Sequence, residues 1–123
     1  MTRTHEVLIV VRRAGEYLVV HRSPENGGYW HQIAGGVEEG ESPAVAAVRE
    51  LGEETGLDVE PVSIAGEFEY DGIHVDCFVA EAPAGWEPTL DWEHDDHRWL
   101  SASAAADLMY WPEPAAILRG LAS

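Results

Sequence analysis

The chain has 123 residues, of which 46% are hydrophobic, and its formal net charge is −16 at pH 7. This length predicts a single domain over residues 1–123, with enough apolar residues for a buried core. The negative charge disfavours nucleic acid and anionic membranes as partners, because both bind basic patches. No apolar run is long enough for a transmembrane helix or a signal peptide, and a lone cysteine, Cys77, excludes an intrachain disulfide, so we expect a cytoplasmic protein.

The predicted elements mix strands and helices. The patterns predict, in chain order, strands at 5–12 and 17–22 joined by a turn at Ala14-Gly15, a loop at 23–28, a short strand at 30–33, a helix at 43–55, a hairpin of 59–70 and 73–80 turning at Asp71-Gly72, a loop at 82–89, a short strand at 98–100, and helices at 102–109 and 113–121. This order predicts the α/β class, as an α/β/α sandwich with a mixed sheet.

Three carboxylates dominate the helix predicted at 43–55. At roughly 100° per residue, Glu50, Glu53 and Glu54 share one narrow arc. The opposite side, which we expect to pack on the sheet, carries Ala44, Val45, Val48, Leu51 and Thr55. Like charges at this spacing repel, so the arc predicts a site for a hard divalent cation.

The boundaries of this helix are also readable. Ser42 is a favourable N-cap, Pro43 suits the first turn, and Gly56 suits the left-handed residue that ends a helix. Upstream, Ala34 and the glycines Gly35 and Gly36 provide backbone that a ligand can approach closely. A glycine loop leading into an acidic helix suits Mg²⁺ bound together with phosphate oxygens.

This segment resembles the Nudix box, written G-x5-E-x7-R-E-U-x-E-E-x-G-U, where U is bulky and apolar. Its fixed positions are all present, as Gly35, Glu41, Arg49, Glu50, Leu51, Glu53, Glu54, Gly56 and Leu57. The resemblance covers nearly the whole chain and implies the Nudix α/β/α sandwich. It also implies a hydrolase that cleaves a phosphoanhydride bond with Mg²⁺, for which Mn²⁺ can substitute.

The resemblance also implies roles for individual residues. Glu53 and Glu54 correspond to metal ligands, and Glu50 to a ligand or general base, with a backbone carbonyl near Ala34 completing the coordination. Arg49 corresponds to a residue that orients its neighbouring glutamates. Glu41 either binds metal or pairs with Arg49, and the sequence leaves both open.

A second motif, Glu93-His94 followed by Trp99-Leu100, resembles the E-H-x4-W-U segment of many Nudix hydrolases. It implies that Glu93 is a fourth catalytic carboxylate, as ligand or base. The alternative for Glu93 is a solvated acidic loop. His94 is expected to contact substrate or to serve structure.

Residues 30–41 resemble the dihydroneopterin triphosphate pyrophosphatase branch, W-x-x-V-x-G-x-V-E-x-G-E, although 112–114 read Pro-Glu-Pro where that branch often has Ser-Asn-Arg. The candidate phosphate contacts are Arg22, Gly35 and Gly36. Trp30, with Tyr70, Trp92 and Trp111 as further candidates, is expected to stack on a ring.

The sequence thus predicts a small-molecule substrate of the nucleoside or pterin di- or triphosphate type, and it leaves homodimerisation open. A Nudix domain that binds a nucleotide as a sensor is the alternative, and the intact glutamate set argues against it. An isoprenyl diphosphate isomerase would need a reactive cysteine, whereas Cys77 lies in a predicted strand.

Overall fold

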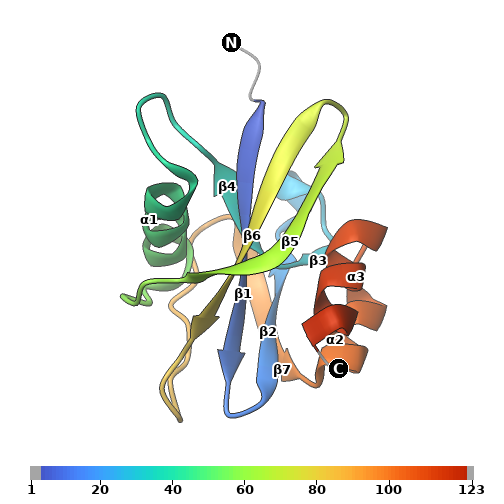
Figure 1. Cartoon of the computed structure of the whole chain (residues 1–123). Coiled ribbons are helices and arrows are strands. Elements are labelled where there is room, and N and C mark those ends of the chain that lie inside the picture. Colours follow the sequence, from blue (N-terminus) through green and yellow to red (C-terminus); the bar gives the residue numbers. More distant parts are fainter. Residues whose placement is uncertain (1–3, 122–123) are drawn as a thin grey trace.

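The computed structural model describes residues 4–121, without the side chains of 63–65. The elements in chain order are β1 (His5–Arg13), β2 (Glu16–Arg22), a 3₁₀ turn (Pro24–Asn26), β3 (Trp30–His31), β4 (Ile33–Gly36), α1 (Pro43–Thr55), β5 (Val62–Tyr70), β6 (Ile73–Glu81), β7 (His94–Leu100), α2 (Ala102–Leu108) and α3 (Pro112–Leu121) (Figure 1).

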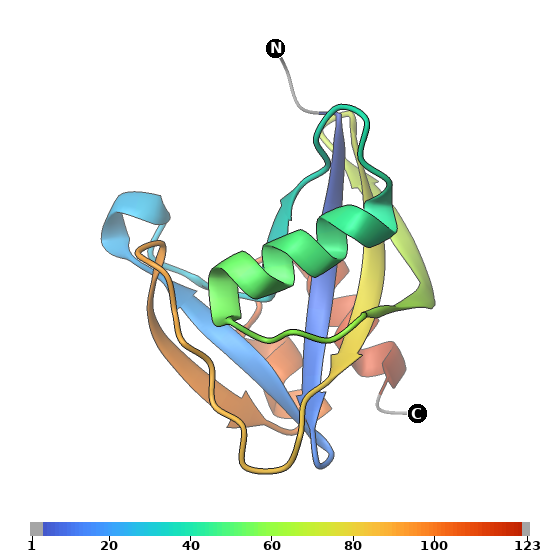
Figure 2. The ribbon, with the colours of Figure 1, turned by 90° about the vertical axis from the view of Figure 1, so that its left-hand side faces the viewer.

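Strand β1 is the centre of a mixed sheet. It runs parallel to β6 and antiparallel to both β4 and β2. β4 pairs with its first half, from Glu6 to Ile9, whereas β2 joins it only at Arg12 and Arg13. The sheet therefore divides beside β1 into a branch of β2, β3 and β7 and a branch of β5 and β6, and Figure 2 shows α1 lying across the strands with these branches on its two sides.

The alternation of side chains along β1 builds two cores. Val7, Ile9 and Val11 belong to a cluster that includes Leu51 of α1, whereas Leu8 and Val10 belong to a second cluster with residues of α2 and α3. These five side chains of β1 are each at most 2% exposed. A central strand that is apolar on both faces needs a layer on each side, and the predicted α/β/α sandwich is confirmed.

Both predicted hairpin turns are present. Ala14-Gly15 and Asp71-Gly72 have positive φ at both positions, as the two-residue turns with matching twist require. The strand predicted at 30–33 is interrupted at Gln32, so that β3 pairs with β2 and β4 pairs with β1. This interruption carries the chain from the branch of β2, β3 and β7 to the central strand β1.

The predicted limits of helix α1 are confirmed, but its predicted packing face is only partly right: Leu51 and Thr55 are buried as expected, whereas Ala44 is exposed. Val45 and Val48 are exposed, and the buried residues of the helix are Ala46, Ala47, Leu51, Glu54 and Thr55. Glu50 and Glu54 thus lie toward the sheet rather than toward solvent. The small alanines let the helix backbone approach the sheet, and this approach brings the carboxylates against β4.

Candidate active site

The Glu50 carboxylate lies against the backbone of Gly35. A Cβ at residue 35 would overlap the carboxyl carbon and both carboxylate oxygens of Glu50. The side chain of Glu50 is only 14% exposed, so it has little freedom to move away. Gly35 is therefore required here for space, and the close approach of β4 to α1 determines where the carboxylate lies.

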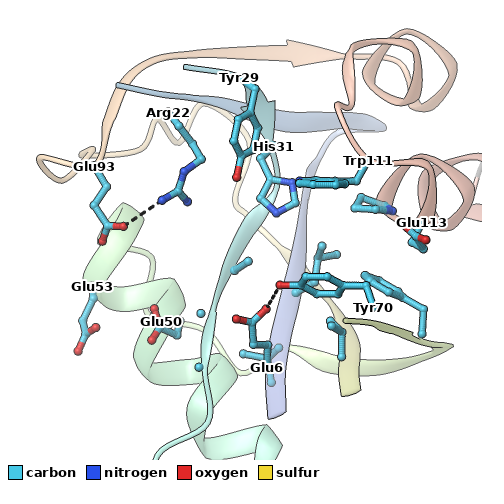
Figure 3. A pocket seen from close by; sticks show the side chains of 18 residues that line it. Glu6, Arg22, Tyr29, His31, Glu50, Glu53, Tyr70, Glu93, Trp111 and Glu113 are labelled. Atoms are coloured by element: carbon cyan, nitrogen blue, oxygen red, sulfur yellow. Dashed lines mark hydrogen bonds and ion pairs between the residues drawn. The ribbon is translucent and has the colours of Figure 1, made fainter. Parts of the chain in front are cut away.

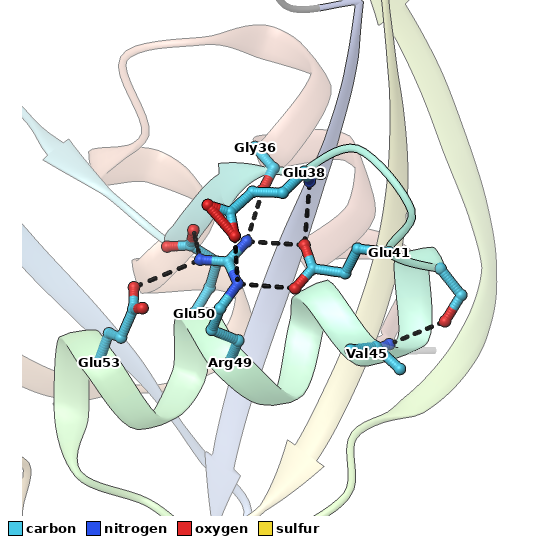
Figure 4. Close-up of polar contacts among 8 residues, drawn as sticks. Gly36, Glu38, Glu41, Val45, Arg49, Glu50 and Glu53 are labelled. Atoms are coloured by element: carbon cyan, nitrogen blue, oxygen red, sulfur yellow. Dashed lines mark hydrogen bonds and ion pairs between the residues drawn. The ribbon is translucent and has the colours of Figure 1, made fainter.

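Arg49 holds the acidic residues around it in place (Figure 4). Its guanidinium binds both oxygens of Glu41, at 2.7 and 2.8 Å, and donates to the Gly36 carbonyl and to Glu50, at 2.9 and 2.7 Å. A weaker contact of 3.4 Å reaches Glu53. Arg49 and the backbone N–H of Glu38 lower the pKa of Glu41 to about 2. Glu41 thus pairs with Arg49, which is one of the two roles that the sequence left open.

Glu54 is the most buried carboxylate of the helix, with 4% of the residue exposed. Burial raises its pKa far above the ordinary value, and contact with Glu50 and the nearby charges of Asp91 and Glu93 act in the same direction. His94 Nε2 lies 3.8 Å from Glu54 Oε1. No arginine among the described residues pairs with Glu54, so its ionised form would need a positive charge that the neighbouring side chains do not supply.

Glu93 reaches the same region from the other branch of the sheet. The register between β2 and β7 shifts between His21 and Arg22, so that Arg22 aligns with His94, and Glu93 lies just before β7. The Arg22 Nη2 and Glu93 Oε2 atoms are 3.6 Å apart, and the Glu93 carbonyl accepts from the Ser23 N–H. The bulge therefore places a cation and a carboxylate side by side, opposite α1.

A cavity of about 410 Å³ joins these groups to an aromatic region (Figure 3). Its polar end contains Arg22, Glu50, Glu53 and Glu93, together with the backbone of residues 34–36. Its other end is lined by Tyr29, His31, Phe68, Tyr70 and Trp111, and by the carboxylates Glu6 and Glu113. One cavity thus brings carboxylates and an arginine at one end together with aromatic rings at the other.

The aromatic side chains form a connected wall. The rings of Tyr70 and Trp111 stack with centroids 6.4 Å apart, and Tyr29 meets Trp111 edge-on at 6.5 Å. The Tyr70 hydroxyl donates to Glu6 at 2.7 Å. These contacts hold the rings of Tyr29, Tyr70 and Trp111 together in the cavity lining, where a planar heterocycle can stack.

Comparison with known proteins agrees with this geometry. The family model described as the NUDIX domain matches residues 2–121. The chain belongs to the Nudix family. The structure is similar to the E. coli dihydroneopterin triphosphate pyrophosphohydrolase (TM-score 0.83, 24% identity, 96% of this chain and 94% of that chain). It is also similar to a C. elegans Ap4A hydrolase (TM-score 0.80, 25% identity, 94% of each chain).

Curated relatives match over parts of their length. An octanoyltransferase of Myxococcus xanthus is 35% identical over 115 residues, which cover 85% of this chain and 32% of that protein. An RNA pyrophosphohydrolase of Roseobacter denitrificans is 40% identical over 62 residues, which cover 50% of this chain and 39% of that protein. The chain thus spans about a third of the length of the curated relatives it matches.

Some residues predicted to contact substrate lie elsewhere in this Nudix domain. Trp30 is not among the lining residues of the cavity, and it packs instead under the guanidinium of Arg98 at 4.6 Å. Trp92 is 78% exposed. His94 is buried beneath the site, where its Nδ1 contacts Asp91 at 2.9 Å, so it supports Glu54 and Asp91 from behind.

Sequence reasoning missed several lining residues, namely Glu6, Tyr29, His31, Phe68 and Glu113. The sequence does carry one indication for Glu6, because a charged residue directly before a buried apolar strand, here Val7 to Val11, is a candidate for a functional role. Burial lowers the pKa of His31 to about 4, helped by the nearby charges of Arg22 and His94, so this ring is neutral at pH 7.

The carboxylate cluster fits a divalent cation. Glu50 and Glu54 touch, Glu53 and Glu93 face the same cavity, and all offer the oxygen ligands that Mg²⁺ prefers. Ala34 lines the cavity beside them, as expected for the carbonyl that the family resemblance implies. The raised pKa of Glu54 marks the position where a positive charge would be most stabilising.

No helix among residues 4–121 combines the length and the apolarity needed to span a lipid bilayer.

Proposed function

We propose that this Nudix domain is a Mg²⁺-dependent pyrophosphohydrolase acting on a nucleoside or pterin di- or triphosphate. The observation that supports it best is the cavity in which Glu50 and Glu53 of α1, Glu93 and Arg22 meet an aromatic wall. Glu54 is not among the lining residues and lies buried behind Glu50, with which it is in contact. Mg²⁺, held by Glu53 and Glu54 with the Ala34 carbonyl, and by Glu50 if Glu50 is not the base, would neutralise phosphate charge and promote ionisation of the attacking water. Mn²⁺ would serve as a substitute.

The side chains of the chain have separable roles in this proposal. Water attacks a phosphorus atom, the anhydride P–O bond breaks, and a carboxylate takes the proton of the water. Glu50 and Glu93 are the candidates for this base, because both line the cavity. Arg49 positions Glu50 and Glu53 from behind, and Arg22 is oriented to bind a phosphate oxygen once it moves from Glu93.

The ring end of the cavity favours a particular kind of heterocycle. Tyr29, Tyr70 and Trp111 offer stacking surfaces, while Glu113 beside Trp111 offers two acceptor oxygens. A carboxylate best binds an edge with two adjacent N–H donors. The amino-pyrimidinone edge that guanine and pterin share has this pattern, whereas uracil presents one donor between two acceptors.

RNA is a weaker candidate, although one relative is an RNA pyrophosphohydrolase by name. A net charge of −16 repels a polyanion, and metal ions at the site compensate only locally. A free nucleotide carries few phosphates beyond those that the metal and Arg22 would bind. The proposal also includes a single domain over 1–123, a cytoplasmic location and a homodimer.

A substrate panel with and without Mg²⁺ tests the proposal. It compares dihydroneopterin triphosphate, GTP, UTP, a sugar nucleotide, a dinucleoside tetraphosphate and 5′-triphosphorylated RNA, with release of phosphate or pyrophosphate as the readout. We expect Mg²⁺-dependent turnover that is highest for the guanine and pterin compounds. Tight binding of a nucleotide without turnover would instead identify a sensor.

The isomerase alternative has little support, because burial raises the pKa of the Cys77 thiol to about 12.

A further inference from the structure

A second group of metal-binding side chains lies away from the cavity, on strands β1 and β6. His5 Nε2 is 2.6 Å from one carboxylate oxygen of Asp76, and His74 Nε2 is 3.3 Å from the other. One nitrogen or oxygen atom from each of the three residues lies within 4.8 Å of the other two. Ligands about 2 Å from one ion lie roughly 3 to 3.5 Å apart, so small movements bring these atoms into a coordination shell.

The sheet brings these residues onto one face. His5 aligns with His74 across the parallel β1–β6 pair, and Asp76 follows two residues later. Side chains two residues apart in a strand, or directly opposite across a pair, share a face. Glu6, Val75 and Phe68, which line the substrate cavity, have the opposite parity, so their side chains lie on the other face of the sheet from the histidine cluster. Val7, which shares the parity of His5, also lines the cavity, so the separation rests on the side chains of the first three residues.

Strand β5 supplies two further carboxylates to this face. Glu67 aligns with Asp76 and Glu69 with His74. Glu67 Oε2 is 3.5 Å from His74 Nε2, and Glu69 Oε1 is 3.5 Å from His74 Nδ1. Glu67 is thus near enough to be a fourth ligand. Glu69 can hold the Nδ1 proton and keep Nε2 free for a metal, as carboxylates beside metal-bound histidines commonly do.

We propose that His5, His74 and Asp76, with Glu67 as a fourth ligand, form a binding site for a borderline transition-metal ion such as Zn²⁺. Two imidazoles with two carboxylates match the ligand preference of Zn²⁺, whereas the carboxylates near α1 suit a harder ion. The two sites therefore select different metals. The bound ion would join the first strand of the chain to β6 and β5, which stabilises the folded state without taking part in hydrolysis.

Calorimetric titration tests the site. Metal-free protein is titrated with Zn²⁺ in excess Mg²⁺, so that oxygen-only sites are already filled. We expect the wild type to bind one equivalent of Zn²⁺ that His74→Gln and His5→Gln both lose, together with the accompanying rise in melting temperature. Glu69→Gln should keep the equivalent with roughly tenfold to hundredfold weaker affinity.

His97→Gln is the matched control, because His97 also contacts one carboxylate, Glu87 at 3.1 Å, but lies on β7. This variant should bind Zn²⁺ as the wild type does. The proposal is overturned if His74→Gln and His5→Gln, both folded by circular dichroism, retain the wild-type equivalent, or if the wild type binds none. Because no substrate is present, these outcomes do not depend on the proposed hydrolysis.

Discussion

The carboxylate of Glu50 occupies the space in which a side chain on Gly35 would begin. Arg49 holds the same carboxylate from the other side, through a 2.7 Å contact, and Gly36 accepts from Arg49 through its carbonyl. The carboxylate of Glu50, a candidate catalytic group, is thus held between the backbone of β4 and the guanidinium of Arg49 on α1. Residue 35 must be glycine for the room it leaves, whereas Gly36 contributes a backbone carbonyl that any residue there would offer.

Gly35→Ala should therefore damage activity more than stability. The added methyl group displaces the Glu50 carboxylate, and displacement of a reacting group by about an ångström can cost roughly 100-fold in turnover. Steady-state kinetics and melting temperature are measured together. Gly52→Ala is the control, since a Cβ there meets nothing within 4 Å and should stabilise the helix by about 0.5–1 kcal/mol. Unchanged turnover in Gly35→Ala would contradict this account of Glu50.

Glu54→Gln should raise the stability of the metal-free protein and lower turnover with Mg²⁺. Without metal the variant should melt at a higher temperature than the wild type. The glutamine has no charge to bury, and it removes the contact between two acidic groups at Glu50 and Glu54. With Mg²⁺ the wild type should gain more stability, and turnover of the variant should fall by about 100-fold or more. Thermal melting with and without Mg²⁺ is the measurement. Equal shifts in both proteins would mean that the ions bind elsewhere on this acidic surface.

His31 predicts an acid-sensitive step in stability. The neutral ring is favoured in the folded state, where its pKa is about 4, whereas the unfolded chain takes up the proton near 6.5. The contribution of neutral His31 to the free energy of unfolding is fully present above pH 6.5. It is lost as the pH falls from 6.5 toward 4, and the loss reaches up to about 3 kcal/mol. Urea unfolding of metal-free protein between these pH values should show a smaller loss for His31→Gln. Parallel curves for the two proteins would exclude His31 as the cause.

The local features of the chain were predictable from sequence, whereas the cavity was not. The limits of α1 follow from Ser42 and Gly56, which act within one turn of the helix. The packing face of α1 was predicted only in part, because the sequence places Glu50 and Glu54 opposite the packing residues, whereas the alanines of the helix let both carboxylates lie toward the sheet. Tyr29 and Trp111 meet only through the pairing of β3 and the position of α3, and no short-range pattern encodes such contacts.

Glu113 should determine which ring the cavity prefers. If its carboxylate accepts from two adjacent N–H groups, Glu113→Gln should lower kcat/KM for GTP by about tenfold, which matches a hydrogen bond to a charged group. ITP, which lacks the 2-amino group, should lose less. The ratio of kcat/KM for the two nucleotides is the measurement. A ratio equal to that of the wild type would place the ring edge away from Glu113.

Glu93 provides the sharpest test of the chemistry. It lines the cavity opposite α1, and its carboxylate is close to Arg22 without the short contact that would commit it to that partner. If Glu93 acts as a base or as a metal ligand in the transition state, Glu93→Gln should lower kcat with little change in KM. Asp95→Asn is the matched control, because Asp95 is a neighbouring carboxylate that binds His21 at 2.7 Å and is not among the lining residues. This control should stay within a few-fold of wild type. If Glu93→Gln also stays within a few-fold of wild type, Glu93 belongs to a solvated acidic loop, and Glu50 becomes the remaining candidate for the base.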